Sequence, residues 1–151
     1  MLRAQSSRLA RLADEYGLPR PLGDPASAVL LVMEPDAGPR ALEALSLSLD
    51  AVGLRNASVC FFSGESLALC ILTLQPRVLV AVGDVPARAV DSVHFPLARN
   101  DFSQATPGEW FDWTASILGL LIPPISPALD DPIRKRRFWS AFLRLRGLRF
   151  S

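Results

Sequence analysis

The chain has 151 residues, 50% of them apolar and 21% charged, which is the size and composition of one globular domain that can bury a core. One histidine and two cysteines exclude a zinc site built from four Cys and His ligands, and an iron–sulphur cluster held by four cysteines of one chain. The net charge of +1 is unevenly distributed. Residues 132–151 hold seven basic residues and no acidic one, whereas residues 1–131 hold nine basic and fifteen acidic residues.

The first 25 residues are predicted to stand apart from the rest. Residues 3–16 have the apolar spacing of an amphipathic helix with arginines between the apolar positions. The side chains concerned are Arg8, Leu9, Arg11, Leu12 and Tyr16. Five glycines and prolines between residues 17 and 25 then interrupt regular structure. We therefore expect a helix and linker over residues 1–25 and a single α/β domain over residues 26–151.

The body alternates strands with helices. Continuous apolar runs are typical of strands covered on both faces, and they predict strands at residues 28–33, 58–62, 77–82 and 118–122. Helices are predicted at residues 40–52, 65–74, 85–91 and 132–146. This order favours an α/β fold with three layers (α/β/α) around a central parallel sheet of about four strands.

The sequence also gives predictions for the last helix and for the segment before the last strand. In the last helix, the core-facing positions are predicted to be Ile133, Phe138, Phe142 and Leu145. Residues 93–114 are predicted to be irregular and are rich in aromatic side chains, which are Phe95, Phe102, Trp110, Phe111 and Trp113. Exposure of these aromatics would indicate a surface for a protein partner.

The loops that follow parallel strands are the usual place for ligands in such folds. They are residues 34–39, 62–65, 83–86 and 123–131. Glu34 and Asp36 follow the first strand, where a general base could lie, although a turn with Asp36 as its cap is the simpler interpretation. Asp130 and Asp131 are expected to cap the last helix.

The scarce reactive residues are interpreted as structural. His94 lies between apolar residues and is predicted to be a half-buried structural histidine. Cys60 and Cys70 are expected to be small core residues. The sequence has no glycine-rich dinucleotide or phosphate-binding motif. We expect no metal site, no cofactor and no catalytic residue.

The last helix combines cations with aromatic side chains. Its candidate contact residues are Arg134, Lys135 and Arg137. Cations early in a helix are unfavourable for its dipole. Three interpretations remain open here: a solvated helix face, a contact with an acidic protein, and a surface for nucleic acid.

Two segments of the chain carry a recognisable pattern, LQPRVLVAVGDVPARAV at residues 74–90 and LIPPISPALDDPIRKRRFW at residues 121–139. They resemble the uracil-DNA glycosylase superfamily. The resemblance implies that fold, with a base-binding pocket at the carboxyl ends of the strands. Ser126 stands where the superfamily motif has its histidine, so the corresponding pocket, marked by Glu34, Asp36 and Ser126, is expected to be vestigial.

A second pattern consists of SPAL at residues 126–129, RRFW at residues 136–139 and the N-terminal segment at residues 6–18. It is similar to the psi subunit family of bacterial DNA polymerase III, which has this fold without the active site. It implies a replication adaptor whose N-terminal segment binds clamp-loader ATPase subunits. The body would bind a chi-like subunit, which contacts single-stranded DNA indirectly through single-strand binding protein.

The alternative functions are a DNA repair enzyme of the glycosylase superfamily and a nucleic-acid-binding protein. The sequence shows neither an export signal nor a stretch long enough to span a membrane. We therefore expect a cytoplasmic protein with reduced thiols and without a membrane partner.

Overall fold

A computed structural model describes residues 28–34, 38–54, 57–61 and 65–146. The predicted N-terminal helix and linker, together with Asp36, lie outside the described residues. Four strands run parallel in the order β2-β1-β3-β5. They are β1 (Val29–Met33), β2 (Ser58–Phe61), β3 (Val78–Val82) and β5 (Leu118–Ile122).

The four parallel strands agree with the prediction, and the sheet has a fifth strand that the sequence did not predict. The two residues of β4 (Phe111–Asp112) pair antiparallel with the outer side of β5. Phe111 lies opposite Gly119 in this pairing, and its ring covers the glycine so closely that a Cβ there would lie 2.5 Å from the ring. The absence of a side chain at Gly119 therefore leaves the space that the end of the Phe111 ring occupies.

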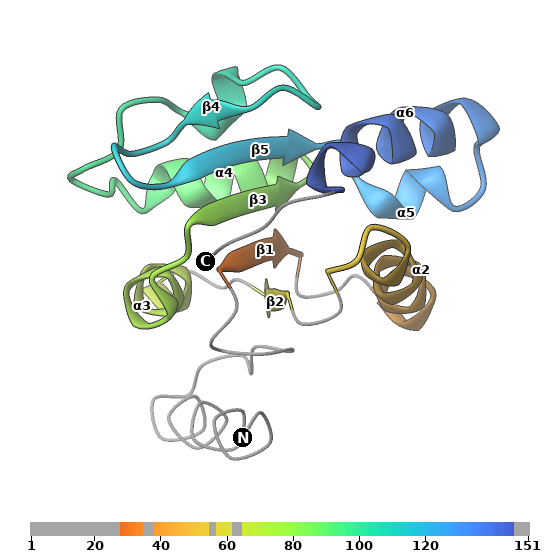
Figure 1. Cartoon of the computed structure of the whole chain (residues 1–151), viewed down its shortest axis with the longest axis horizontal. Helices are drawn as coiled ribbons and strands as arrows, with labels where there is room; N and C mark the ends of the chain where they lie inside the picture. Colours follow the sequence, from red (N-terminus) through yellow and green to blue (C-terminus); the bar gives the residue numbers. More distant parts are fainter. Residues whose placement is uncertain (1–27, 35–37, 55–56, 62–64, 147–151) are drawn as a thin grey trace, which may run out of the picture.

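Helices cover both faces of the sheet because successive strand residues point in opposite directions. One face packs against α2 (Gly38–Ala51), α5 (Ile125–Ala128), α6 (Pro132–Phe142) and the 3₁₀ turn η2 (Leu143–Leu145). The other face packs against α3 (Glu65–Leu74), α4 (Asp84–Ser92) and the 3₁₀ turn η1 (Phe102–Gln104). Figure 1 shows β1, β3 and β5 running in one direction, with α5 and α6 beside α2. The predicted mixed α/β class and its parallel sheet are confirmed.

The strands are buried as their composition predicted. Every residue of β1 and β3 is buried, and four of the five residues of β5 are buried. Such strands have no polar face to offer to solvent, so they form only in a sheet that is covered on both sides. Within the described residues, no helix is both long enough and apolar enough to cross a membrane.

The last helix begins at Pro132 as predicted but differs from its prediction in its C-terminal part and at one core position. It is regular only to Phe142, and η2 completes it. Phe138, Phe142 and Leu145 are buried, but Ile133 is 62% exposed, so its predicted core position was wrong. Ile133 lies in the first turn of α6, before the part of the helix whose side chains join the core.

Candidate functional site

The strand order creates a crevice between β1 and β3. The helix after β1 packs on one face of the sheet and the helix after β3 packs on the other. The segment that leads from β1 to α2 and the segment that leads from β3 to α4 therefore diverge where these neighbouring strands end. Ligands of open α/β sheets bind at such a switch point, outside the carboxyl ends of the strands.

A hollow of about 390 Å³ lies at this point, and we call it the switch-point cleft. It brings together Glu34 from the end of β1 and Ser126 from the first turn of α5, two residues that are 92 positions apart in the sequence. Asp84 and Arg88 of α4 complete its polar lining. The sequence therefore placed Glu34 and Ser126 at one site correctly, whereas nothing in the sequence singled out Asp84 or Arg88.

The chemistry of this cleft is limited by its side chains. A serine hydroxyl is a poor proton acceptor compared with the histidine that the glycosylase motif has at that position. His94 does not replace it, because His94 follows the C-terminal end of α4, whereas the cleft is lined by Asp84, Val85 and Arg88 from the first half of this helix. His94 is exposed and has a φ of 51°, so the prediction of a half-buried histidine was wrong.

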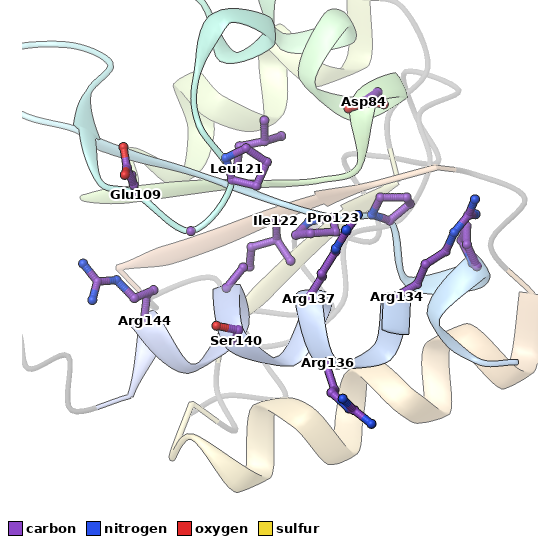
Figure 2. A pocket seen from close by; sticks show the side chains of 15 residues that line it. Asp84, Glu109, Leu121, Ile122, Pro123, Arg134, Arg136, Arg137, Ser140 and Arg144 are labelled. Atoms are coloured by element: carbon purple, nitrogen blue, oxygen red, sulfur yellow. The ribbon is translucent and has the colours of Figure 1, made fainter. Parts of the chain in front are cut away.

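A larger hollow of about 1040 Å³ continues from the cleft along α6, and we call it the arginine groove. The two hollows share Asp84, Pro124 and Pro127. One wall is the face of α6 and η2 that carries Arg134, Arg137 and Arg144 (Figure 2). The opposite wall carries Glu109, in the loop before β4.

The predicted basic surface is divided between two sides of α6. Arg134 and Arg137 line the arginine groove, but Lys135 lines a different hollow. Arg136 lines both hollows, and its side chain extends from α6 toward α2 (Figure 2). The sequence identified the basic cluster but did not separate these two faces, and it did not single out Arg144, Ser140 or Glu109 as lining residues.

The second side of α6 borders a hollow of about 380 Å³ between α2, α5 and α6, which we call the apolar groove. Its lining is apolar except for Lys135, Arg136 and Ser48. The Ser48 hydroxyl donates a hydrogen bond to the Ala44 carbonyl at 2.7 Å, so it is occupied within its own helix. Arg40 of α2 pairs with Asp130, in the loop between α5 and α6, at 3.1 Å.

The aromatic residues of the 93–114 segment form part of the core. Trp113 is 1% exposed, stacks on Phe95 with 5.1 Å between ring centroids, and lies 6.0 Å from Phe102. Trp110 and Phe111 are half-buried and pack on the core. These rings therefore form no large exposed patch, and they give no support to a partner surface at this place.

The two cysteines are neighbours, one on β2 and one on α3. Cys60 is buried, and Cys70 is half-buried. A hydrogen bond between the two thiols, together with burial, raises the pKa of Cys60 well above that of an ordinary thiol. A thiol with a raised pKa has little nucleophilic thiolate at neutral pH, which agrees with the structural role predicted for Cys60.

The start of α6 is fixed by Asp131. Its carboxylate accepts hydrogen bonds from the backbone N–H groups of Ile133 at 2.9 Å and Arg134 at 3.4 Å, which confirms the predicted cap. The same carboxylate lies 3.6 Å from the Nε atom of Arg134. One anion therefore satisfies the helix start and offsets the cations of its first turn.

We expect Asp131→Ala to lower the free energy of unfolding by about 1 kcal/mol, the usual cost of removing a helix cap. The measurement is urea unfolding followed by far-UV circular dichroism. Asp130→Ala is the matched control, because the interaction that the structure describes for Asp130 is an exposed pair with Arg40, which contributes roughly 0–1 kcal/mol. An equal loss in the two variants would contradict the role given to the cap.

Within the described residues, no group of three or more His, Cys, Asp or Glu side chains is placed to hold a metal ion. No protein-family model matches the chain, and a search of the curated proteins found no match.

Proposed function

We propose that this protein is a non-catalytic replication adaptor, similar to the psi subunit of bacterial DNA polymerase III, with a uracil-DNA glycosylase-like fold. In this proposal the N-terminal segment, through Arg8, Leu9, Arg11, Leu12 and Tyr16, binds clamp-loader ATPase subunits. The body binds a chi-like protein, which reaches single-stranded DNA through single-strand binding protein.

The observation that carries the proposal is where the residues of the family resemblance come together. Ala128 and Leu129 from the SPAL segment, and Arg136, Phe138 and Trp139 from the RRFW segment, all line the apolar groove. The apolar lining offers a partner the burial that drives most protein association. The cations Lys135 and Arg136 at its edge would attract acidic groups. We therefore propose that the chi-like protein occupies this groove with an apolar segment flanked by acidic residues.

The switch-point cleft supports a role without catalysis. Its described lining offers Glu34, Asp84, Arg88 and Ser126 but no histidine. A carboxylate such as Glu34 could still position a water molecule, so the enzyme alternative calls for a direct assay.

We expect the full-length protein to bind a chi-like subunit from the same organism, measured by isothermal titration calorimetry. Lys135→Glu should weaken that binding roughly tenfold, because it replaces an attraction at the groove edge by a repulsion. Ser48→Phe should abolish it by filling the groove from α2. Arg99→Glu is the matched control, since Arg99 is exposed and lies in the loop between α4 and η1.

Two results would contradict the adaptor proposal. One is an affinity for the chi-like subunit that neither Lys135→Glu nor Ser48→Phe changes, in variants that melt at the wild-type temperature. The other is release of uracil from single-stranded DNA above background, lost in a Glu34→Gln variant. The second result would establish the glycosylase alternative.

A further inference from the structure

The arginine groove has an arrangement of charge that the adaptor function does not use. Arg137, Ser140 and Arg144 follow one another at intervals of three and four residues, so they lie in a row on one face of α6 and η2. Arg134 lies one turn before Arg137. The row from Arg134 to Arg144 extends about 15 Å along the helix.

The positive charges of these arginines are balanced by few anionic groups among the described residues. Arg134 is 62% exposed, and its one ion pair among the residues that the structure describes is the 3.6 Å contact of its Nε atom with Asp131. Arg137 and Arg144 are exposed, and within the described part of the chain they make neither a hydrogen bond nor an ion pair. Their guanidinium groups are therefore available to an anionic ligand, and guanidinium is well suited to phosphate.

The remaining lining of the groove differs from the arginine wall. Its floor and opposite side are formed mainly by apolar residues of the β5 end, two loops and α5, which are Pro107, Leu121, Ile122, Pro123, Pro124 and Pro127. Two carboxylates, Glu109 and Asp84, lie across the groove from α6 (Figure 2). Cations thus occupy one wall, while apolar surface and hydrogen-bond acceptors occupy the other.

We propose that the arginine groove binds single-stranded nucleic acid directly, with the phosphates on the α6 wall and the bases on the opposite wall. Apolar surface suits the faces of unstacked bases. A carboxylate such as Glu109 can accept hydrogen bonds from the amino groups of bases. This inference goes beyond the adaptor function, in which contact with single-stranded DNA is indirect, and it does not depend on that function.

The two-sided lining favours a single strand over the other polyanions. An acidic peptide would place its carboxylates near Glu109 and Asp84 as well as near the arginines, and like charges repel. A duplex keeps its bases stacked inside, so it would present only phosphates and would leave the apolar wall unused. A single strand alone offers charge on one side and ring faces on the other.

The test is fluorescence anisotropy of a labelled ten-residue oligodeoxycytidylate, whose bases carry amino groups, with the full-length protein over a range of salt concentrations. We expect a dissociation constant of about 1–100 µM at low salt, as for binding that is mainly electrostatic. Three arginine–phosphate contacts predict that log K falls against log salt with a slope of about −2, since each contact on a single strand contributes about −0.7.

The decisive variant is Arg137→Ala/Arg144→Ala. It should weaken binding at least tenfold at low salt and reduce the slope to about −0.7, the value expected for the remaining contact. The control is Arg40→Ala/Arg99→Ala, which removes the same charge elsewhere on the surface and should leave both quantities near wild type. The four arginines are exposed, so thermal melts should show both proteins folded.

Several outcomes would overturn the inference. They are the absence of binding at low salt, a slope near zero, and an equal loss in the two double variants. Tighter binding of a duplex of the same length would exclude a single-strand site, and displacement of the oligonucleotide by poly-glutamate at matched charge would assign the groove to an acidic protein. Loss of oligonucleotide binding in Arg137→Ala/Arg144→Ala with intact binding of the chi-like subunit would separate this site from the adaptor surface.

Discussion

Replacing Trp113 by alanine is expected to lower the free energy of unfolding by about 3–5 kcal/mol, which is a large part of the stability of a domain of this size. Trp113 is 1% exposed and joins Phe95 and Phe102 in the core under α4 and η1. Its removal leaves a cavity that the neighbouring rings cannot fill without losing their own contacts. Urea unfolding followed by far-UV circular dichroism measures the change.

Leu97→Ala is the control for this variant, because Leu97 belongs to the same part of the chain but is 69% exposed. Its effect should stay within about 0.5 kcal/mol. A Trp113→Ala protein as stable as the Leu97→Ala protein would show that the aromatic segment does not pack on the sheet. In that case the aromatic side chains of residues 93–114 would become a candidate partner site.

The parallel strands could be predicted because each carries its own signal. The buried runs of β1 and β3 are apolar at every position, and this pattern has one simple interpretation, a strand covered on both faces. The two residues of β4 are too few to form such an apolar run. In their pairing with β5, Phe111 lies over Gly119. The sequence gives no sign that these two residues are neighbours in the fold.

The candidate site was predictable where it depends on strand ends. Glu34 and Ser126 follow parallel strands of one sheet, and the carboxyl ends of such strands meet at one edge. The arginine groove depends instead on how the loop before β4 faces α6, which brings Glu109 opposite the arginines. That arrangement results from tertiary packing, so the charge pattern alone left the role of the basic helix open.

His94 shows a different limit of sequence reasoning. Its apolar neighbours suggested partial burial, but α4 ends at Ser92, and His94 continues the chain with a positive φ. A residue in that conformation belongs to a turn. Turns lie at the surface, so the side chain is exposed whatever the character of its neighbours.

Replacing Gly83 by alanine is expected to cost about 1–3 kcal/mol of stability and to alter the place where the switch-point cleft and the arginine groove meet. Gly83 joins β3 to α4 with φ 109° and ψ 169°, a conformation that is essentially restricted to glycine. A Cβ atom there would lie 3.2 Å from the Cβ atom of Pro124, which lines both hollows. The backbone N–H of Gly83 also donates a hydrogen bond to the Ile122 carbonyl at 2.7 Å, so the segment has little freedom to move away.

Gly53→Ala provides the comparison for Gly83→Ala. Gly53 also has a positive φ, 80°, but a Cβ atom there would meet nothing within 4 Å, so its substitution costs backbone strain alone. The difference between the two unfolding free energies therefore measures the more restricted backbone of Gly83 together with its contact with Pro124. Equal losses would mean that Pro124 moves away from the added Cβ atom without a further loss of stability, and that the wall between the two hollows deforms easily. A larger loss at Gly83, accompanied by weaker oligonucleotide binding, would show that the strand-to-helix turn after β3 holds the shape of the groove.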